Sequence, residues 1–173
     1  MTIVMTVFVR GYEKREQVTK QFLLSLCGNC NKLILATTET RDVSAYPQLV
    51  KDNWAKDDLI LLEHDIIPTT AEFDGIRNCN HDICNFSYYI PITNGNKPGY
   101  GLLATGLGLS KFSLRFQQHN NVNEVFNTNT FINIDAKVNE YLNSHNMKWH
   151  NHGIVEHNYK IEDLKDDYKR KVW

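Results

Sequence analysis

The sequence has no excess of charge of either sign. Its 19 basic and 20 acidic residues give a formal net charge of -1 at pH 7. Proteins that bind nucleic acids usually present a basic surface to the phosphates, and the overall charge here gives no support for one. We therefore expect no nucleic acid among the partners of this protein.

Long hydrophobic runs are also missing. No apolar stretch approaches the roughly 20 residues of a membrane-spanning helix, so we expect no integral membrane segment. The first ten residues lack the basic region and the small-residue cleavage site of a secretory signal peptide, and they are typical of a strand instead. These absences favour an intracellular, cytoplasmic protein.

Two common nucleotide-binding motifs are absent as well. The phosphate-binding pattern Gly-x-x-x-x-Gly-Lys-Ser/Thr does not occur. Gly106 and Gly108 form a Gly-x-Gly pair, but no third glycine follows at the required spacing, and the pair stands too late for a first βα turn. A dinucleotide-binding fold is therefore disfavoured.

Cysteine is scarce, with four residues in the chain: Cys27, Cys30, Cys79 and Cys84. The two-residue gap between Cys27 and Cys30 is typical of a zinc knuckle or a redox pair. A redox pair of the thioredoxin type should begin a helix after a strand, whereas this pair follows a helical pattern and precedes a strand. A four-cysteine zinc site, free thiols and bridged pairs all remain open.

The chain does contain the pattern of a single α/β domain. Its 173 residues match the usual size of one domain. Strands alternate with helices through the first ~75 residues, which is typical of a largely parallel sheet. We expect strands at 2–9, 32–36, 58–63 and 83–90, and helices at 13–26, within 43–55, from 68 onward with Thr69 or Thr70 as its cap, at 111–117 after Ser110, and at 135–146.

Three finer features complete this prediction. Val18, Phe22 and Leu26 are spaced by four and predict the buried face of the first helix. Glycine and proline pairs within 93–101 predict a loop. The charged run 162–171 predicts a solvated helix face.

The most informative segment is the strand at 58–63, whose apolar run stops at Glu63-His64-Asp65. Such a run is typical of a strand buried on both faces of a parallel sheet. Ligands of open α/β sheets bind beyond the carboxyl ends of the strands. Carboxylates there suit Mn²⁺ or Mg²⁺, and such an ion suits a diphosphate. The alternative is that Glu63 and Asp65 only end the strand and cap a turn.

A late histidine cluster offers partners for Asp65. His150 and His152 would face one side of a strand, because side chains on a strand repeat every two residues. His157 would face the other side unless Gly153 breaks the strand. We expect one of the three histidines to meet Asp65 at a divalent metal. The alternative is that they are surface or hydrogen-bonded histidines.

In this order, the motifs resemble those of a GT-A-fold glycosyltransferase. The first strand ends at Arg10, and Glu63-His64-Asp65 is similar to the Asp-x-Asp metal motif of that family, with glutamate in place of the first aspartate. The segment from Gly106 to Phe112 looks like the part that shapes the acceptor side, and the histidine-rich strand looks like the part that completes the metal site. The likeness covers roughly residues 3–157 and is closest to small stand-alone versions from phages and other viruses.

The resemblance implies an α/β, GT-A-like (Rossmann-like) fold with a mostly parallel or mixed sheet and helices on both faces. It implies a single domain over 1–173, with a nucleotide-binding half at 1–90, an acceptor-side half at 91–160 and a charged tail at 161–173. The implied activity is a metal-dependent transfer of a sugar from a nucleotide sugar to a glycan, protein or lipid acceptor, with Mn²⁺ or Mg²⁺ as cofactor. A viral protein of this kind would act in the host cytoplasm, and a homo-oligomer could complete its acceptor site.

The resemblance also assigns roles to single residues. Asp135, just before a predicted helix, takes the place of the general base, and its alternative role is a plain helix N-cap. The remaining assignments are metal binding by Asp65, His157 and His152; donor binding by Arg10, Thr38, Arg41 and Glu63; and acceptor contacts by Gly106, Gly108 and Phe112.

Two other functions remain open at this point. A non-catalytic protein could retain the fold as a binding or structural module, because the chain is short for an acceptor subdomain. A metal-dependent phosphoesterase or nuclease would use the cluster of His150, His152 and His157.

Overall fold

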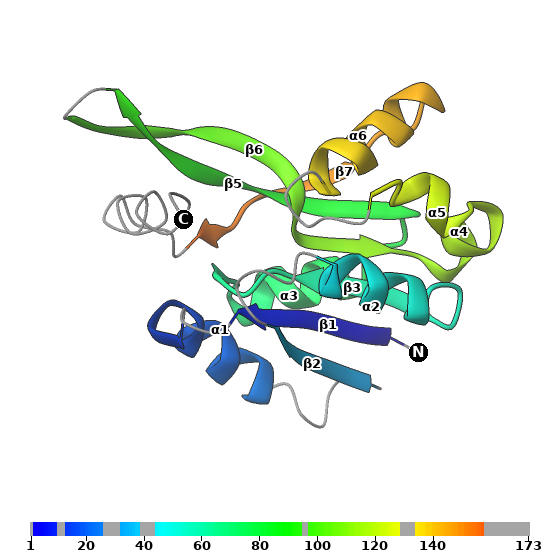
Figure 1. Ribbon diagram of the computed structural model, residues 1–173, viewed down its shortest axis with the longest axis horizontal. Coiled ribbons are helices and arrows are strands. Elements are labelled where there is room, and N and C mark those ends of the chain that lie inside the picture. The colour runs from blue at the N-terminus through cyan, green and yellow to red at the C-terminus, as the bar shows by residue number, and fades with distance from the viewer. Residues whose placement is uncertain are drawn as a thin grey trace.

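The computed structural model describes residues 2–9, 13–25, 32–38, 44–94, 97–128 and 134–157. A six-stranded sheet forms the centre, with helices on both faces and a two-stranded sheet at its side (Figure 1). The large sheet contains β1 (Thr2–Val9), β2 (Lys32–Thr38), β3 (Asp58–Leu62), β5 (Ile83–Asn94), β6 (Lys97–Phe112) and β7 (His150–Ile154), and the small one β4 (Ile66–Ile67) and β8 (Glu156–His157).

The strands of the large sheet lie in the order β2-β1-β3-β6-β5-β7. β1 pairs in parallel with both β2 and β3, and β5 pairs in parallel with β7, whereas β6 runs antiparallel to β3 and β5. The α/β fold with a mixed sheet is therefore confirmed. Since β1, β2 and β3 are parallel, their carboxyl ends meet at one edge of the sheet.

Helices cover both faces, as expected for strands that are apolar on both sides. The bounds are α1 (Glu13–Ser25), α2 (Ala45–Asn53), α3 (Thr70–Arg77), α4 (Leu114–His119), α5 (Val122–Val125) and α6 (Ile134–Ser144). One core contains side chains of α2, α4, α5 and α6, and the other contains side chains of α1 and α3. Met5 of β1 belongs to the first core and Val4 to the second, so neighbouring residues anchor opposite layers.

The apolar residues of β3, Leu59 to Leu62, are buried completely. Each such side chain stabilises the fold by about 2 kcal/mol through apolar burial. The chain is thus held rigidly up to Leu62, the residue before the acidic segment.

Three expectations about local structure were wrong. Residues 97–101 belong to β6, because the turn signals mark only the tip of a long β5–β6 hairpin that extends away from the body of the molecule (Figure 1). The helix expected at 111–117 begins at Leu114 with Ser113 as its cap, since β6 continues to Phe112. The buried face expected for α1 is wrong at Val18, which is 42% exposed, whereas Phe22 does pack against the core. Among the described side chains of α1, Thr19 and Leu23 are buried, and Leu26 lies outside the described residues. The charged run 162–171 lies outside the described residues.

None of the helices in the described ranges is long and apolar enough to cross a membrane.

The capping of α3 gives a first testable prediction. The Thr69 hydroxyl accepts from the Glu72 backbone N–H, and the Glu72 carboxylate accepts from the Thr69 N–H at 2.6 Å. Thr69→Ala is expected to lower the free energy of unfolding by about 1 kcal/mol, because a helix N–H loses its partner. Urea denaturation measures this change. Thr70→Ala, one position further on, serves as the control and should have a smaller effect.

Candidate metal and nucleotide site

The acidic segment after β3 is buried at the carboxyl edge of the sheet. Glu63, His64 and Asp65 are 8%, 9% and 5% exposed. The Glu63 N–H donates to Gly108 of β6 at 2.8 Å, and the Ile66 N–H donates back to the Glu63 carbonyl at 3.2 Å. These bonds turn the chain sharply into β4 and hold the acidic side chains beneath the surface.

Asp65 meets His157 through the small sheet. β4 pairs with β8 so that Ile66 lies opposite His157. His157 Nε2 is consequently 3.3 Å from Asp65 Oδ2, and His64 Nε2 is 3.8 Å from the same oxygen. The structure brings together the aspartate and one of the three histidines considered in the sequence.

The hydrogen bond made by Nδ1 of His157 determines which ring nitrogen is available to a metal. Nδ1 lies 3.1 Å from the Tyr89 carbonyl oxygen. A carbonyl only accepts, so Nδ1 is the donor of this contact, and Nε2 is the ring nitrogen left facing Asp65. Metal-binding histidines commonly have this arrangement, with the far nitrogen donating to a carbonyl and the near one left to coordinate.

Glu63 and Asp135 add further acidic groups to Asp65. Burial raises the pKa of Glu63 well above its usual value, and the nearby carboxylates of Asp135 and Asp65 raise it further. Burial also raises the pKa of Asp135, against hydrogen bonds from Leu107 and Tyr88 that lower it. Buried like charges favour protonation or a bound cation.

A break in strand pairing holds Asp135 in place. Phe86 pairs with Leu109, but the next β5 residue, Ser87, pairs with Thr105, which leaves residues 106–108 of β6 as extra residues opposite β5. The freed Leu107 N–H donates to Asp135 Oδ1 at 2.9 Å. A bulge of this kind locally redirects backbone groups out of the ladder, and here it directs an N–H toward a carboxylate.

The two glycines of this bulge allow close packing. A Cβ at Gly106 would lie 2.7 Å from Cγ of Asp135, and one at Gly108 would lie 2.5 Å from the Tyr88 ring. Tyr88 in turn donates its hydroxyl to Asp135 Oδ2 at 3.2 Å, while its ring centroid is 5.1 Å from that of His157. Tyr88 thus connects Asp135 to the histidine of the Asp65 pair.

Other residues named from the sequence lie apart from this cluster. His152 on β7 stacks on Phe86 and lies near Cys79 and Cys84. Gly153, with φ +123°, lies between His152 and His157. Phe112 is fully buried in an aromatic core at the opposite end of β3, where it pairs with Leu59. The structure does not bring either side chain to Asp65.

The residues proposed for the nucleotide lie partly outside the described ranges. Thr38 ends β2 opposite Val9, at the same sheet edge as Glu63, and its side chain is not described. Arg10 and Arg41 both fall outside the described residues.

A hollow of about 590 Å³ lies at the opposite edge of the sheet. Ile83, Arg115, His119 and His150 are among its lining residues. Ile83 pairs with Phe112, which pairs with Leu59 at the start of β3. The hollow is therefore separate from the carboxylates at the other end of that strand.

No protein-family model matches the sequence, and a search of curated proteins finds no match. Solved structures do resemble it. One is described as the "crystal structure of a glycosyltransferase involved in the glycosylation of the major capsid of PBCV-1"; it is 11% identical over 98% of each chain, with a TM-score of 0.53. The chain shares the fold of that protein. A putative glucose-1-phosphate thymidylyltransferase from Bacillus anthracis, solved with sucrose, is 10% identical over 87% of each chain, with a TM-score of 0.49.

The sequence did not identify two members of the cluster. Tyr88 lies within the strand expected at 83–90 and is 3% exposed, and its hydroxyl reaches Asp135. Leu107 contributes its backbone N–H, which donates to Asp135. In the sequence, only Gly106 and Gly108 on either side of Leu107 hint at an irregular backbone here. Asp135 is the second residue of α6 rather than a residue before the helix.

The raised pKa of Glu63 gives a second testable prediction. The folded state holds the proton more tightly than the unfolded chain, so its contribution to stability is complete below the usual pKa and is lost as pH rises toward the folded pKa. The free energy of unfolding of the metal-free protein should fall by about 1.4 kcal/mol per pH unit in this window. Glu63→Gln should flatten this dependence in urea titrations; identical slopes for both proteins would contradict the prediction.

Proposed function

We propose that this protein is a metal-dependent glycosyltransferase that moves a sugar from a nucleotide sugar to an acceptor hydroxyl. The observation that carries this proposal is the buried pair of Asp65 and His157 at the carboxyl edge of the sheet. Its position is the one at which open α/β sheets bind ligands. The shared fold with a glycosyltransferase supports the same proposal.

The residues present fit a divalent cation. Asp65 offers a carboxylate oxygen and His157 an oriented imidazole nitrogen, a mixed donor set that suits Mn²⁺ and is compatible with Mg²⁺. Burial raises the pKa of both Glu63 and Asp135, and a cation bound beside them would favour their ionised forms. When bound, such an ion would neutralise the charge that develops on a leaving diphosphate.

The chain's own residues would divide the remaining work. We assign the carboxyl ends of β1–β3, within residues 1–90, to the nucleotide, with Glu63 toward the ribose. Asp135 would take the proton from the acceptor hydroxyl, because its pKa is raised toward the range of an effective base. Tyr88 and the Leu107 N–H would hold that carboxylate in position, and residues 91–160 would form the acceptor side.

Thermal melting with Mn²⁺ and a panel of nucleotide sugars tests the proposal. A ligand that binds only the folded state raises the melting temperature by mass action. We expect an increase that requires both the metal and one nucleotide sugar, and that identifies the donor base. If no member of the panel shifts the melting temperature with Mn²⁺ or Mg²⁺, the fold serves as a non-catalytic module.

A further inference from the structure

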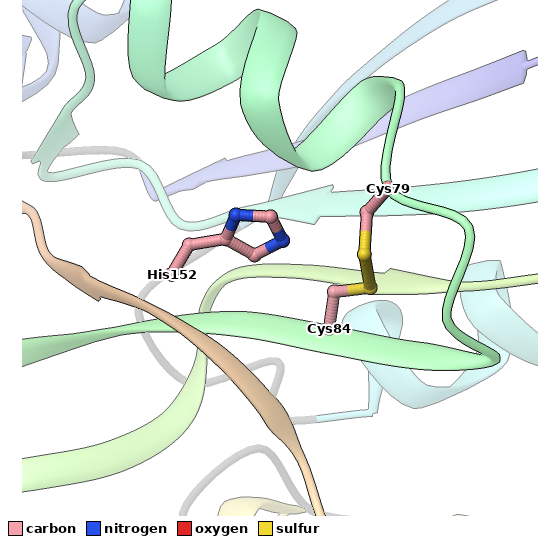
Figure 2. Close-up of side chains that lie close together, drawn as sticks. All are labelled: Cys79, Cys84 and His152. Atoms are coloured by element: carbon pink, nitrogen blue, oxygen red, sulfur yellow. A yellow bond between two sulfur atoms is a disulfide. The ribbon is translucent and has the colours of Figure 1, made fainter.

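A second group of potential metal ligands lies away from Asp65. Cys79 follows α3, Cys84 lies in β5 and His152 lies in the edge strand β7. One ligand atom from each of the three lies within 4.8 Å of the other two. Figure 2 shows the His152 ring pointing toward the two sulfur atoms, which are joined as a disulfide.

A further observation supports metal binding by these residues. Nε2 of His152 is buried and has no hydrogen-bond partner among the described residues. A buried polar atom without a partner costs about 1–3 kcal/mol, which a bound metal would offset.

We propose that the reduced forms of Cys79 and Cys84 bind Zn²⁺ together with Nε2 of His152. Two thiolates and one imidazole form a common zinc donor set, with a fourth position for water. Neither cysteine belongs to the Asp65 cluster, so this site is independent of the proposed glycosyltransferase site.

Conversion of the Cys79–Cys84 disulfide into the zinc-bound dithiolate balances in electrons and protons. Two molecules of a small thiol reductant give up two electrons and two protons and become joined by a disulfide. The Cys79–Cys84 bond breaks and yields two thiols. Binding of Zn²⁺ then releases both thiol protons, because the thiolate is the ligand.

The zinc site would connect the edge strand β7 to two better-anchored parts of the fold, β5 and the end of α3. Among the described strands, β7 is the outer strand of the large sheet and pairs with β5 alone. It leads through Val155 into β8, which carries His157. A metal held by residues of α3's C-terminal loop, β5 and β7 would therefore fasten this edge strand.

Cobalt titration tests the proposal, since Co²⁺ replaces Zn²⁺ and absorbs in the near ultraviolet when thiolates bind it. The full chain is reduced, stripped of metal and titrated with Co²⁺ without oxygen, and Zn²⁺ is then added to displace it. We expect one thiolate-bound Co²⁺ per chain, none in the oxidised protein, and affinity more than about 100-fold weaker in His152→Ala.

Three sets of variants make the result specific. The double variant Cys27→Ser with Cys30→Ser should keep the absorption, as should Asp65→Asn, whereas Cys79→Ser and Cys84→Ala should each lose it. Circular dichroism confirms that each variant is folded. Absorption that disappears only with Cys27 and Cys30, or a reduced wild-type protein without thiolate-bound Co²⁺, would overturn the proposal.

Discussion

Replacing Asp65 with asparagine is expected to remove the Mn²⁺-dependent stabilisation that a nucleotide sugar gives to the wild-type protein. The side chain keeps its volume but loses the charge that faces Nε2 of His157 at 3.3 Å. At a ligand concentration 100 times the dissociation constant, binding stabilises the fold by about 2.7 kcal/mol. A 100-fold loss of affinity leaves about 0.4 kcal/mol of that stabilisation.

Two further variants accompany Asp65→Asn in the melting experiment: one should keep the stabilisation and one should lose it. Asp74→Asn removes a more exposed carboxylate that pairs with Arg77 on α3, and it should keep the full stabilisation. His157→Gln should behave like Asp65→Asn, because it removes the other proposed metal ligand. Unchanged Mn²⁺-dependent stabilisation in Asp65→Asn would show that the metal binds elsewhere.

Asp135→Asn is expected to lower kcat by about 10²–10⁴-fold while nucleotide-sugar binding stays intact. This range is the usual contribution of a positioned general base. The substitution removes the basic oxygen but keeps an acceptor for the Leu107 N–H, which is 2.9 Å from Oδ1. Hydrolysis of the nucleotide sugar by water provides the assay until an acceptor is known, and melting with Mn²⁺ shows that the donor still binds.

Tyr88→Phe separates the chemical role of Asp135 from a structural one. The Tyr88 hydroxyl bond lowers the pKa of Asp135, so its loss should raise that pKa further. The base works only when deprotonated, and the acidic limb of the pH–rate profile should therefore move to higher pH. Nearly full activity in Asp135→Asn would instead indicate a retaining mechanism, which needs no such base.

The location of Asp65 at the end of a buried strand could be predicted, because apolar residues are followed directly by charged ones. An apolar run that stops at Glu63 defines a buried strand end, and the sheet order then determines where that end lies. The choice of His157 over His152 could not be predicted, because it depends on Gly153 and on the pairing of β8 with β4. The sequence alone gives three candidate rings, those of His150, His152 and His157, and does not say which strand each one joins.

The placement of Asp135 illustrates a second limit. Its position near the start of a helix was predictable, but its partner is a backbone N–H released by a three-residue register shift. Such a shift depends on how two long strands twist around each other, and the Gly-x-Gly spacing was interpreted as an acceptor segment instead.

The late position of β8 has a consequence for how the molecule folds. His157 contacts the Tyr89 carbonyl across 68 positions and joins Asp65 across a still longer stretch of chain. Contacts between distant positions form slowly, because the chain between them must lose conformational entropy before the stabilising contact is made. Until β8 pairs with β4, the acidic residues that follow β3 lack their contact with the imidazole of His157. We expect this corner to assemble last in refolding experiments, and Mn²⁺ to slow unfolding more than it speeds folding.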